Sequence, residues 1–142
     1  MSYATLTQLE DRYGTRMLVE LTDRDTPKTG AIDADVVERA FTDTDAVIDG
    51  HILGRYKLPL AETPPMLADL AAAIAIYKLH RFTPPEKIKE DYERALSQLD
   101  KIAKGTIRLP LEGVEVPSSG SSGVQTTDRE RHFTEENLRG WI

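Results

Sequence analysis

The feature of this chain that most constrains its fold is a nearly uninterrupted apolar run at residues 66–82, MLADLAAAIAIYKLHRF. Proline pairs bracket it, Pro64-Pro65 before it and Pro84-Pro85 after it. Proline is well tolerated in the first turn of a helix, where its missing N–H is not needed. A helix that is apolar nearly all round has no face for water, so the run predicts the central, most buried helix of a bundle.

Helical spacing of apolar residues recurs on both sides of this run. Two short amphipathic helices are expected at Thr5–Tyr13 and Thr15–Leu21, divided at Gly14. After Pro84-Pro85, apolar residues at intervals of three and four run as far as Ala103 and indicate another amphipathic helix. Gly105 follows it at a position that suits a helix end.

The remaining helix should begin after Asp33, which fits the N-cap position, and run to about Arg55. Asp43, Asp45 and Asp49 are expected on its solvent-exposed face. Together these segments predict a mainly α protein, a small bundle of four to five helices, followed by an extended and partly flexible C-terminal tail.

The chain divides by composition into four parts. Residues 1–105 carry the helical pattern and should form the core domain; 106–117, TIRLPLEGVEVP, read as an extended or hairpin arm. The Ser/Gly-rich stretch at 118–127 is typical of a flexible linker. Residues 128–142 recover apolar and charged character, which is typical of a segment that docks onto a partner. The alternative is that this segment folds back onto its own helical core. Its candidate docking residues are Arg129, Arg131, Phe133, Leu138, Arg139 and Trp141.

Composition excludes several classes of function. The chain has no cysteine, which rules out disulfides, thiolate metal sites and cysteine nucleophiles. The longest fully apolar stretch, about Leu70–Tyr77, is far shorter than the roughly 20 residues of a membrane span, and the N-terminus does not resemble a signal peptide. Residues 1–50 hold 11 acids and 5 bases, so the net charge of −6 lies in the first third of the chain. No basic stripe of the kind that binds nucleic acid is present.

No constellation of catalytic or metal-binding residues stands out. The three histidines, His51, His80 and His132, lie in different elements without metal-ligand spacing, although the first two could meet in space. The spacing of Asp43, Asp45 and Asp49 only partly matches a calcium loop, because Val47 and Gly54 occupy positions that need oxygen ligands. We therefore expect no catalytic site, no cofactor and no metal.

The corner between the two longest apolar segments, GRYKLPLAETPP, contains an arginine and a tyrosine beside a glycine. Arg55 in the last turn of a helix complements the helix dipole and can bond free carbonyl groups. Tyr56 can place its ring on the core while its hydroxyl stays in water. We interpret the corner as a structural turn; direct ligand binding is the alternative. The turn residues are Gly54, Arg55, Tyr56, Pro59, Leu60, Pro64 and Pro65.

The order of these motifs resembles a known family. GRYKLPL, TPPML, the alanine-rich AAAIAIYKLHRF and a tail with RERHFTEENLRGWI are similar to the small head–tail joining proteins of Mu-like phages and prophages. The similarity is densest at Ile48–Leu67 and Arg131–Trp141. The resemblance implies a structural, non-enzymatic virion protein that joins the portal vertex to the tail as a ring.

The resemblance also implies partners and a location. Portal, tail and neck proteins would be its neighbours, and further copies of the chain would complete the ring. The protein would be located in the host cytoplasm during assembly and in the virion neck afterwards. DNA would pass by without specific binding, which the acidic bias of the first third favours.

Two alternatives remain open from the sequence. One is an assembly chaperone or regulator that binds a single partner through its C-terminal segment and forms no ring. The other is a small helical hydrolase that uses Asp45, Asp49 and His51. A pocket on which those three side chains converge would favour the hydrolase.

Overall fold

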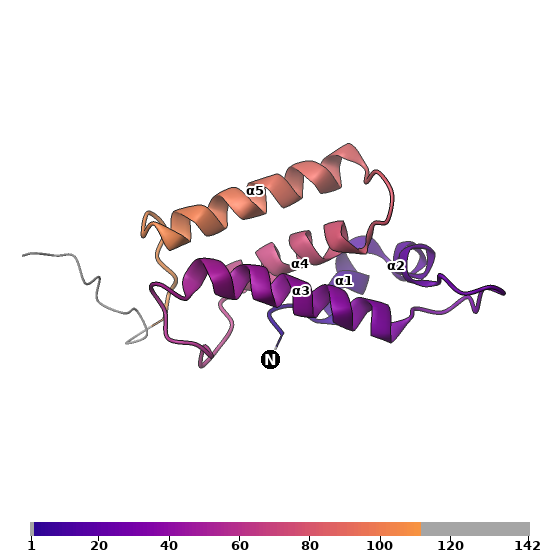
Figure 1. Cartoon of the computed structure of the whole chain (residues 1–142), viewed down its shortest axis with the longest axis horizontal. Helices are drawn as coiled ribbons and strands as arrows, with labels where there is room; N and C mark the ends of the chain where they lie inside the picture. The colour runs from indigo at the N-terminus through magenta and orange to yellow at the C-terminus, as the bar shows by residue number, and fades with distance from the viewer. Residues whose placement is uncertain (1, 112–142) are drawn as a thin grey trace, which may run out of the picture.

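The structure is a computed structural model that describes residues 2–111. Within this range the chain forms five helices and no strand. The helices are α1 (Leu6–Tyr13), α2 (Thr15–Thr22), α3 (Ala34–Ile52), α4 (Pro65–Leu79) and α5 (Glu86–Ala103). The three long helices lie side by side with α4 between α3 and α5, and the two short helices cover one end of them (Figure 1). The predicted mainly α bundle is confirmed.

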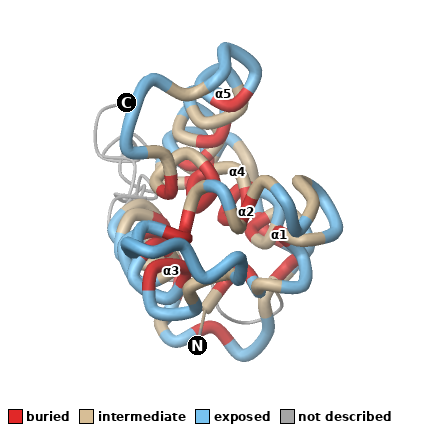
Figure 2. The backbone as a smooth tube through the Cα atoms, turned by 90° about the vertical axis from the view of Figure 1, so that its right-hand side faces the viewer, coloured by how far each residue is buried: buried red, intermediate tan, exposed pale blue. Residues whose placement is uncertain are grey.

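Helix α4 is the central helix, as the apolar run predicts. Eight of its side chains are buried, and they point to all sides of the helix. Those residues are Leu67, Leu70, Ala71, Ala72, Ile74, Ala75, Ile76 and Leu79. Buried positions concentrate along this inner helix, while the outer faces of α3 and α5 are exposed (Figure 2). Burial of apolar surface contributes about 25 cal/mol per Å² to folding. The packing of α3 and α5 against the buried side chains of α4 is therefore the main source of stability.

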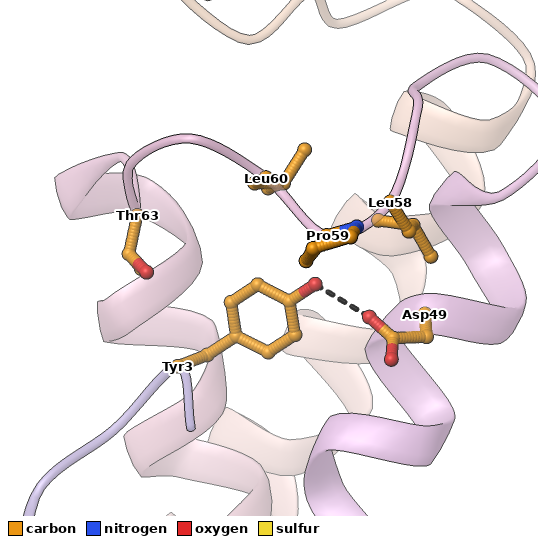
Figure 3. Close-up of a pocket in the computed structure, with 6 residues that line it drawn as sticks. All are labelled: Tyr3, Asp49, Leu58, Pro59, Leu60 and Thr63. Atoms are coloured by element: carbon orange, nitrogen blue, oxygen red, sulfur yellow. Dashed lines mark hydrogen bonds between the residues drawn. The ribbon is translucent and has the colours of Figure 1, made fainter. Parts of the chain in front are cut away.

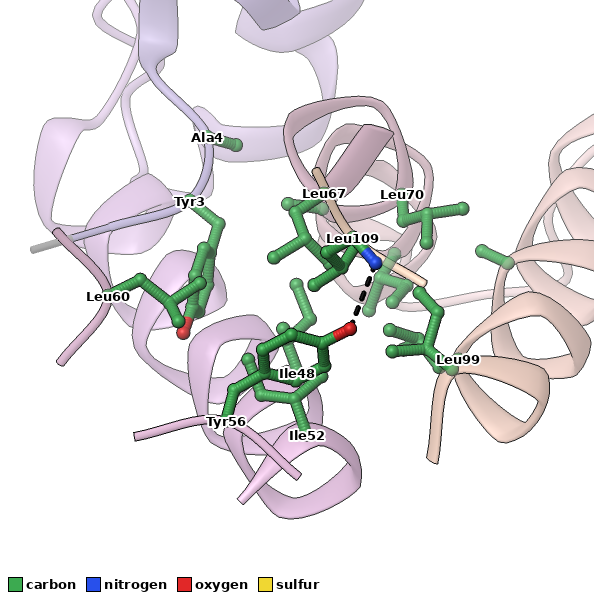
Figure 4. Packing of buried hydrophobic residues seen from close by; sticks show 14 residues of the cluster. Tyr3, Ala4, Ile48, Ile52, Tyr56, Leu60, Leu67, Leu70, Leu99 and Leu109 are labelled. Carbon is green, nitrogen blue, oxygen red and sulfur yellow. Dashed lines mark hydrogen bonds between the residues drawn. The ribbon is translucent and has the colours of Figure 1, made fainter. Parts of the chain in front are cut away.

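The core has two lobes that meet along α4. One lobe joins the C-terminal halves of α3 and α5 to the first half of α4, and it includes Tyr3, Tyr56 and Leu109 (Figure 4). The other lobe joins α1 and α2 to the N-terminal half of α3 and the last half of α4. Phe41 lies against both lobes.

Local capping explains where the helices begin. Thr5 and Gln8 form a reciprocal capping box at α1, and the Asp33 carboxylate accepts from the N–H groups of Asp35 and Val36 at α3. Pro64 and Pro85 occupy the N-cap positions of α4 and α5. All of these starts agree with the sequence expectations.

Helix α4 ends three residues earlier than the apolar run. Leu79 is its last residue, and His80 adopts an extended backbone with its Nδ1 close to the Ile76 carbonyl oxygen at 2.7 Å. Pro84 disfavours helical backbone in Thr83, the residue directly before it, so the helix has to end ahead of the proline pair. Arg81 and Phe82 therefore lie in the connection to α5 rather than on the central helix.

No helix in the described range is long and apolar enough to cross a membrane. The first residues of the predicted arm, 106–111, run back along the core, where Leu109 is buried. The rest of the arm, the linker at 118–127 and the docking segment at 128–142 lie outside the described residues, and so do all six predicted docking side chains.

Candidate functional site

The corner between α3 and α4 is a compact, hydrogen-bonded turn. The N–H groups of Arg55 and Tyr56 both donate to the carbonyl of Ile52, the last residue of α3. Gly54 is exposed in this turn, Leu58–Pro59 is a cis peptide bond, and Leu60 is buried. Pro64 and Pro65 then start α4. The corner thus reverses the chain between two antiparallel neighbouring helices.

Arg55 bonds backbone carbonyls, but they belong to α5 and not to its own helix. Its Nε donates to the Ala103 oxygen and its Nη2 to the Lys104 oxygen, both at 2.8 Å. The guanidinium therefore caps the C-terminal end of α5, where free carbonyls and the helix dipole favour a positive charge. Gly105 makes this approach possible: a Cβ there would lie 2.4 Å from the Arg55 Cζ, and its φ is +80°.

Tyr56 is inserted into the core lobe of α3, α4 and α5 and is only 1% exposed. Its hydroxyl oxygen accepts a hydrogen bond from the backbone N–H of Leu109 at 2.9 Å (Figure 4). The expectation that this hydroxyl stays in water is wrong, because the chain after α5 returns over the ring and covers it. A buried N–H without an acceptor costs about 1–3 kcal/mol, so the hydroxyl has a defined structural role.

Arg55 and Tyr56, with Gly105 and Leu109 opposite them, form what we call the clasp. It ties the corner after α3 to the segment after α5. These contacts fix the path of residues 103–109 and so the direction in which the chain leaves the helical core. These contacts favour the structural interpretation of the turn over direct ligand binding.

A pocket of about 320 Å³ lies beside the corner. It is lined by Tyr3, Asp49, Leu58, Pro59, Leu60 and Thr63 (Figure 3). The Tyr3 hydroxyl donates to the Asp49 Oδ1 at 2.5 Å, across from the three consecutive apolar residues of the corner. Burial, followed by the hydrogen bond to Asp49, raises the pKa of the Tyr3 phenol above its usual value, so the phenol keeps its proton. We call this site the Tyr3 pocket.

Asp45 and Asp49 do not lie on the solvent-exposed helix face that is expected from the sequence. The Asp45 Oδ1 accepts from the Tyr3 backbone N–H at 3.1 Å and from the Ser2 hydroxyl at 3.3 Å. Burial raises the pKa of Asp45 above its usual range, partly offset by these two bonds. The acids thus anchor the N-terminal segment onto α3, a pairing across more than forty positions that no local pattern reveals.

The residues proposed for a hydrolase do not converge. His51 contacts the Val47 carbonyl with Nδ1 at 2.7 Å and the Asp100 carboxylate with Nε2 at 3.3 Å. It lies two positions beyond Asp49, about 200° around the helix, and so faces α5 rather than the Tyr3 pocket. Between residues 2 and 111, no group of three or more His, Asp or Glu side chains is arranged to hold a metal ion.

A second feature, which the sequence analysis does not identify, lies at the other end of α4. Two adjoining hollows share Arg24 and Leu79. One also contains Arg39, Lys78 and the carboxylate of Asp43, and the other contains Arg81 and Phe82 with Lys28, Glu20, Asp23 and Asp25. Phe82 is 87% exposed. We call the four cations, Arg24, Arg39, Lys78 and Arg81, the basic groove. In the described part of the chain no carboxylate lies within ion-pair distance of any of them.

Arg24 organises the basic groove. Its Nη2 donates to the Leu79 carbonyl at 3.0 Å and its Nε to the Leu21 carbonyl at 3.2 Å, so it caps α4 and α2 together. Burial first, and then the charges of Arg81 and Arg39, lower the pKa of Arg24. A guanidinium keeps its charge under these conditions. Asp43, Asp23 and Asp25 line the same two hollows, so cations and carboxylates alternate at this end of the protein. In the sequence, the feature that points to this surface is the pair Arg81–Phe82, which lies shortly before the proline pair Pro84-Pro85.

Comparison with known proteins gives the chain a family. The model of the family described as "Bacteriophage Mu, Gp36" matches residues 3–127. A "Mu-like prophage FluMu protein gp36" from Haemophilus influenzae is 27% identical over 140 residues, which cover 99% of this chain and 98% of that protein. "Gene product J" of Escherichia phage Mu is 32% identical over 105 residues, 74% of each chain. This chain therefore belongs to the bacteriophage Mu Gp36 family.

Proposed function

We propose that this protein is a head–tail connector of a Mu-like phage or prophage, a structural adaptor that joins the portal vertex to the tail. The family match over residues 3–127 carries the proposal. It agrees with the motif resemblance, which covers the corner, the central helix and the charged helix that follows. The protein acts in the host cytoplasm during assembly and stays at the virion neck.

The geometry supports a division of labour within the chain. The helical core is compact, and the clasp holds residues 103–109 in one direction at its edge. A C-terminal segment that leaves from a fixed point can reach a neighbouring protein while its origin stays in register with the core. Residues 128–142 supply the aromatic and arginine side chains typical of interface anchors. We propose that they dock onto a neighbouring copy or onto the portal.

In this proposal the core copies surround the DNA channel as a ring, and DNA passes without specific binding. The net charge of −6 disfavours lasting contact with phosphates. The purified protein should therefore not retard duplex DNA in a gel at physiological salt. Retardation that disappears on charge reversal of Arg39 would contradict this part of the proposal.

The experiment that tests the function is an early stop codon in this gene in an inducible lysogen. Electron microscopy of the lysate should show heads and tails that have not joined, and complementation from a plasmid should restore virions. Mass spectrometry of wild-type virions should detect the protein. An assembly chaperone would give the same defect but be absent from virions. Normal infectious particles without the gene product would contradict both.

A truncation that ends at Pro117 separates the core from the docking segment. The five helices described between residues 2 and 111 and the clasp remain in this variant, so we expect a nearly unchanged melting temperature. We also expect loss of joined particles when it replaces the full-length protein. Unfolding of the truncated chain, or normal assembly with it, would refute the docking role of residues 128–142.

A further inference from the structure

The Tyr3 pocket and the exposed Arg81–Phe82 pair lie at opposite ends of α4. Thr63 of the pocket directly precedes the helix, and Phe82 follows its end. A helix of 15 residues is about 22 Å long, so one copy cannot bring the two features together. In Figure 1 the corner is at the left of the molecule and the connection between α4 and α5 is at the right.

The two features are chemically complementary. The Tyr3 pocket offers the apolar side chains of Leu58, Pro59 and Leu60, the edge of an aromatic ring, and the Asp49 carboxylate. The Asp49 Oδ1 is bonded to Tyr3, and its second oxygen has no protein partner within the described chain. An aromatic ring beside a guanidinium matches this combination, because the ring can contact the apolar wall while the guanidinium bonds the free oxygen.

Size agrees with chemistry. An apolar cavity of about 150 Å³ accommodates benzene. The Tyr3 pocket, at about 320 Å³, therefore has room for a phenylalanine ring and the end of an arginine side chain. Isolated exposed apolar residues are common and mean little alone. Phe82 differs because it is 87% exposed beside Arg81, which has no carboxylate within ion-pair distance in the described chain, although the hollow that holds both also contains Glu20, Asp23 and Asp25.

We infer that the Arg81–Phe82 pair of one copy inserts into the Tyr3 pocket of the next copy. A contact between two different surfaces of the same chain is heterologous, and heterologous contacts close into rings when the rotation per copy allows it. The inference rests on the proposed connector function and identifies the contact that builds its ring. Aromatic and arginine side chains in desolvated pockets are the usual energetic centres of such interfaces.

The absence of natural cysteine allows a direct test by disulfide cross-linking. The double variant Phe82→Cys/Thr63→Cys, carried by the phage, should give a ladder of disulfide-linked multimers from purified particles on a non-reducing gel. Reductant should collapse the ladder to monomer. The matched control is Leu53→Cys/Thr63→Cys: Leu53 is also exposed but lies at the same end as the pocket, so this pair should give no ladder.

A competing occupant of the pocket is the C-terminal segment, which also carries an arginine near a phenylalanine. The variant Phe133→Cys/Thr63→Cys tests it in the same particles. A ladder from this pair and none from Phe82→Cys/Thr63→Cys overturns the inference in favour of the tail. Particles that contain the Phe82→Cys/Thr63→Cys protein without any cross-link overturn it as well.

A second measurement does not depend on cross-linking. Phe82→Ala should reduce the amount of this protein in purified particles by about tenfold or more, the loss expected for an interface anchor. Leu53→Ala should leave the amount unchanged. Normal incorporation of Phe82→Ala overturns the inference. Absence of the wild-type protein from virions would instead refute the connector function itself, so the two failures are distinguishable.

Discussion

The chain carries two arginine–aromatic pairs, Arg55–Tyr56 and Arg81–Phe82, one at either end of α4 and each followed by a proline pair. Tyr56 is 1% exposed, whereas Phe82 is 87% exposed. Arg55 bonds two carbonyls at the end of α5, and Tyr56 bonds the segment that follows. Arg81 has no ion pair within the described chain.

The difference arises from what the rest of the chain brings to each end. At the first pair, the segment after α5 returns over the corner and supplies acceptors for Arg55 and a donor for Tyr56. At the second pair, the ends of α2 and α4 already have their capping partner in Arg24. An arginine followed by an aromatic residue therefore stabilises the fold in one place and remains exposed to a partner in the other.

The largest expected contrast is between the two aromatic side chains. Tyr56→Ala should lower the free energy of unfolding by about 3–5 kcal/mol, because it empties a buried ring site in the core. Phe82→Ala should change it by less than about 0.5 kcal/mol, since its ring contacts mainly solvent. Urea denaturation followed by circular dichroism measures both. Equal losses at the two sites would remove the distinction.

The next contrast concerns the glycine under the Arg55 guanidinium. Gly105→Ala should cost about 1–2 kcal/mol for the left-handed backbone alone, and its Cβ would also displace Arg55. Gly50→Ala is the matched control with the opposite sign. Gly50 lies within α3 with no atom within 4 Å of an added Cβ, so alanine there should stabilise by about 0.5–1 kcal/mol.

If Gly105 acts through Arg55, the two substitutions should not be additive. The double variant Gly105→Ala/Arg55→Ala should lose less stability than the sum of the single losses, since the side chain that clashes is gone. A double-mutant cycle measured in urea gives the coupling. Full additivity would mean that the close approach has no energetic consequence.

A smaller contrast separates the two arginines. Arg55→Ala should lower the free energy of unfolding by about 1 kcal/mol, the scale of a lost helix cap. Arg81→Ala should leave stability unchanged or raise it slightly, because it relieves repulsion of Arg24. If Arg55→Ala keeps full stability but loses assembly, Arg55 has a docking role and not a structural one.

The sequence predicts local features of this fold well. Proline pairs marked the starts of α4 and α5, Gly14 separated α1 from α2, and Asp33 capped α3, because each acts on its own neighbours in the chain. The clasp was not predictable in the same way. Arg55 meets Ala103 across 48 positions, and Tyr56 meets Leu109 across 53, and neither separation leaves a periodic signal.

The Tyr3 pocket shows the same limit more strongly. Asp49 fits an acidic helix face as well as a buried partner of Tyr3, and only the return of the N-terminal segment onto α3 decides between them. From the sequence, Phe82 belongs to the apolar central run, because an apolar residue at this position continues it. The backbone leaves the helix at His80 and carries Phe82 away from the core.

The two ends should also respond to pH with opposite signs. Near the corner, burial raises the pKa of Asp45; near the basic groove, hydrogen bonds from Gly30 and Thr29 lower the pKa of Asp23. A carboxyl whose pKa is raised makes the folded state bind more protons than the unfolded state. Its contribution to folding stability therefore falls as the pH rises above about 3.9, the pKa of an aspartate in the unfolded chain. A lowered pKa gives stability that is present above this value and is lost as pH falls.

Asparagine at either position removes the titratable carboxyl group. Comparison with the wild type then shows the sign of that carboxyl's pH-dependent contribution to stability. From pH 3 to pH 7, the stability of Asp45→Asn relative to wild type should rise, while that of Asp23→Asn relative to wild type should fall. Asp25→Asn, an exposed carboxylate in the loop after α2, reports the effect of removing charge alone. Urea midpoints at several pH values measure all three. Slopes of the same sign for Asp45→Asn and Asp23→Asn would contradict the burial of one carboxylate and the hydrogen bonding of the other, and with it the different construction of the two ends.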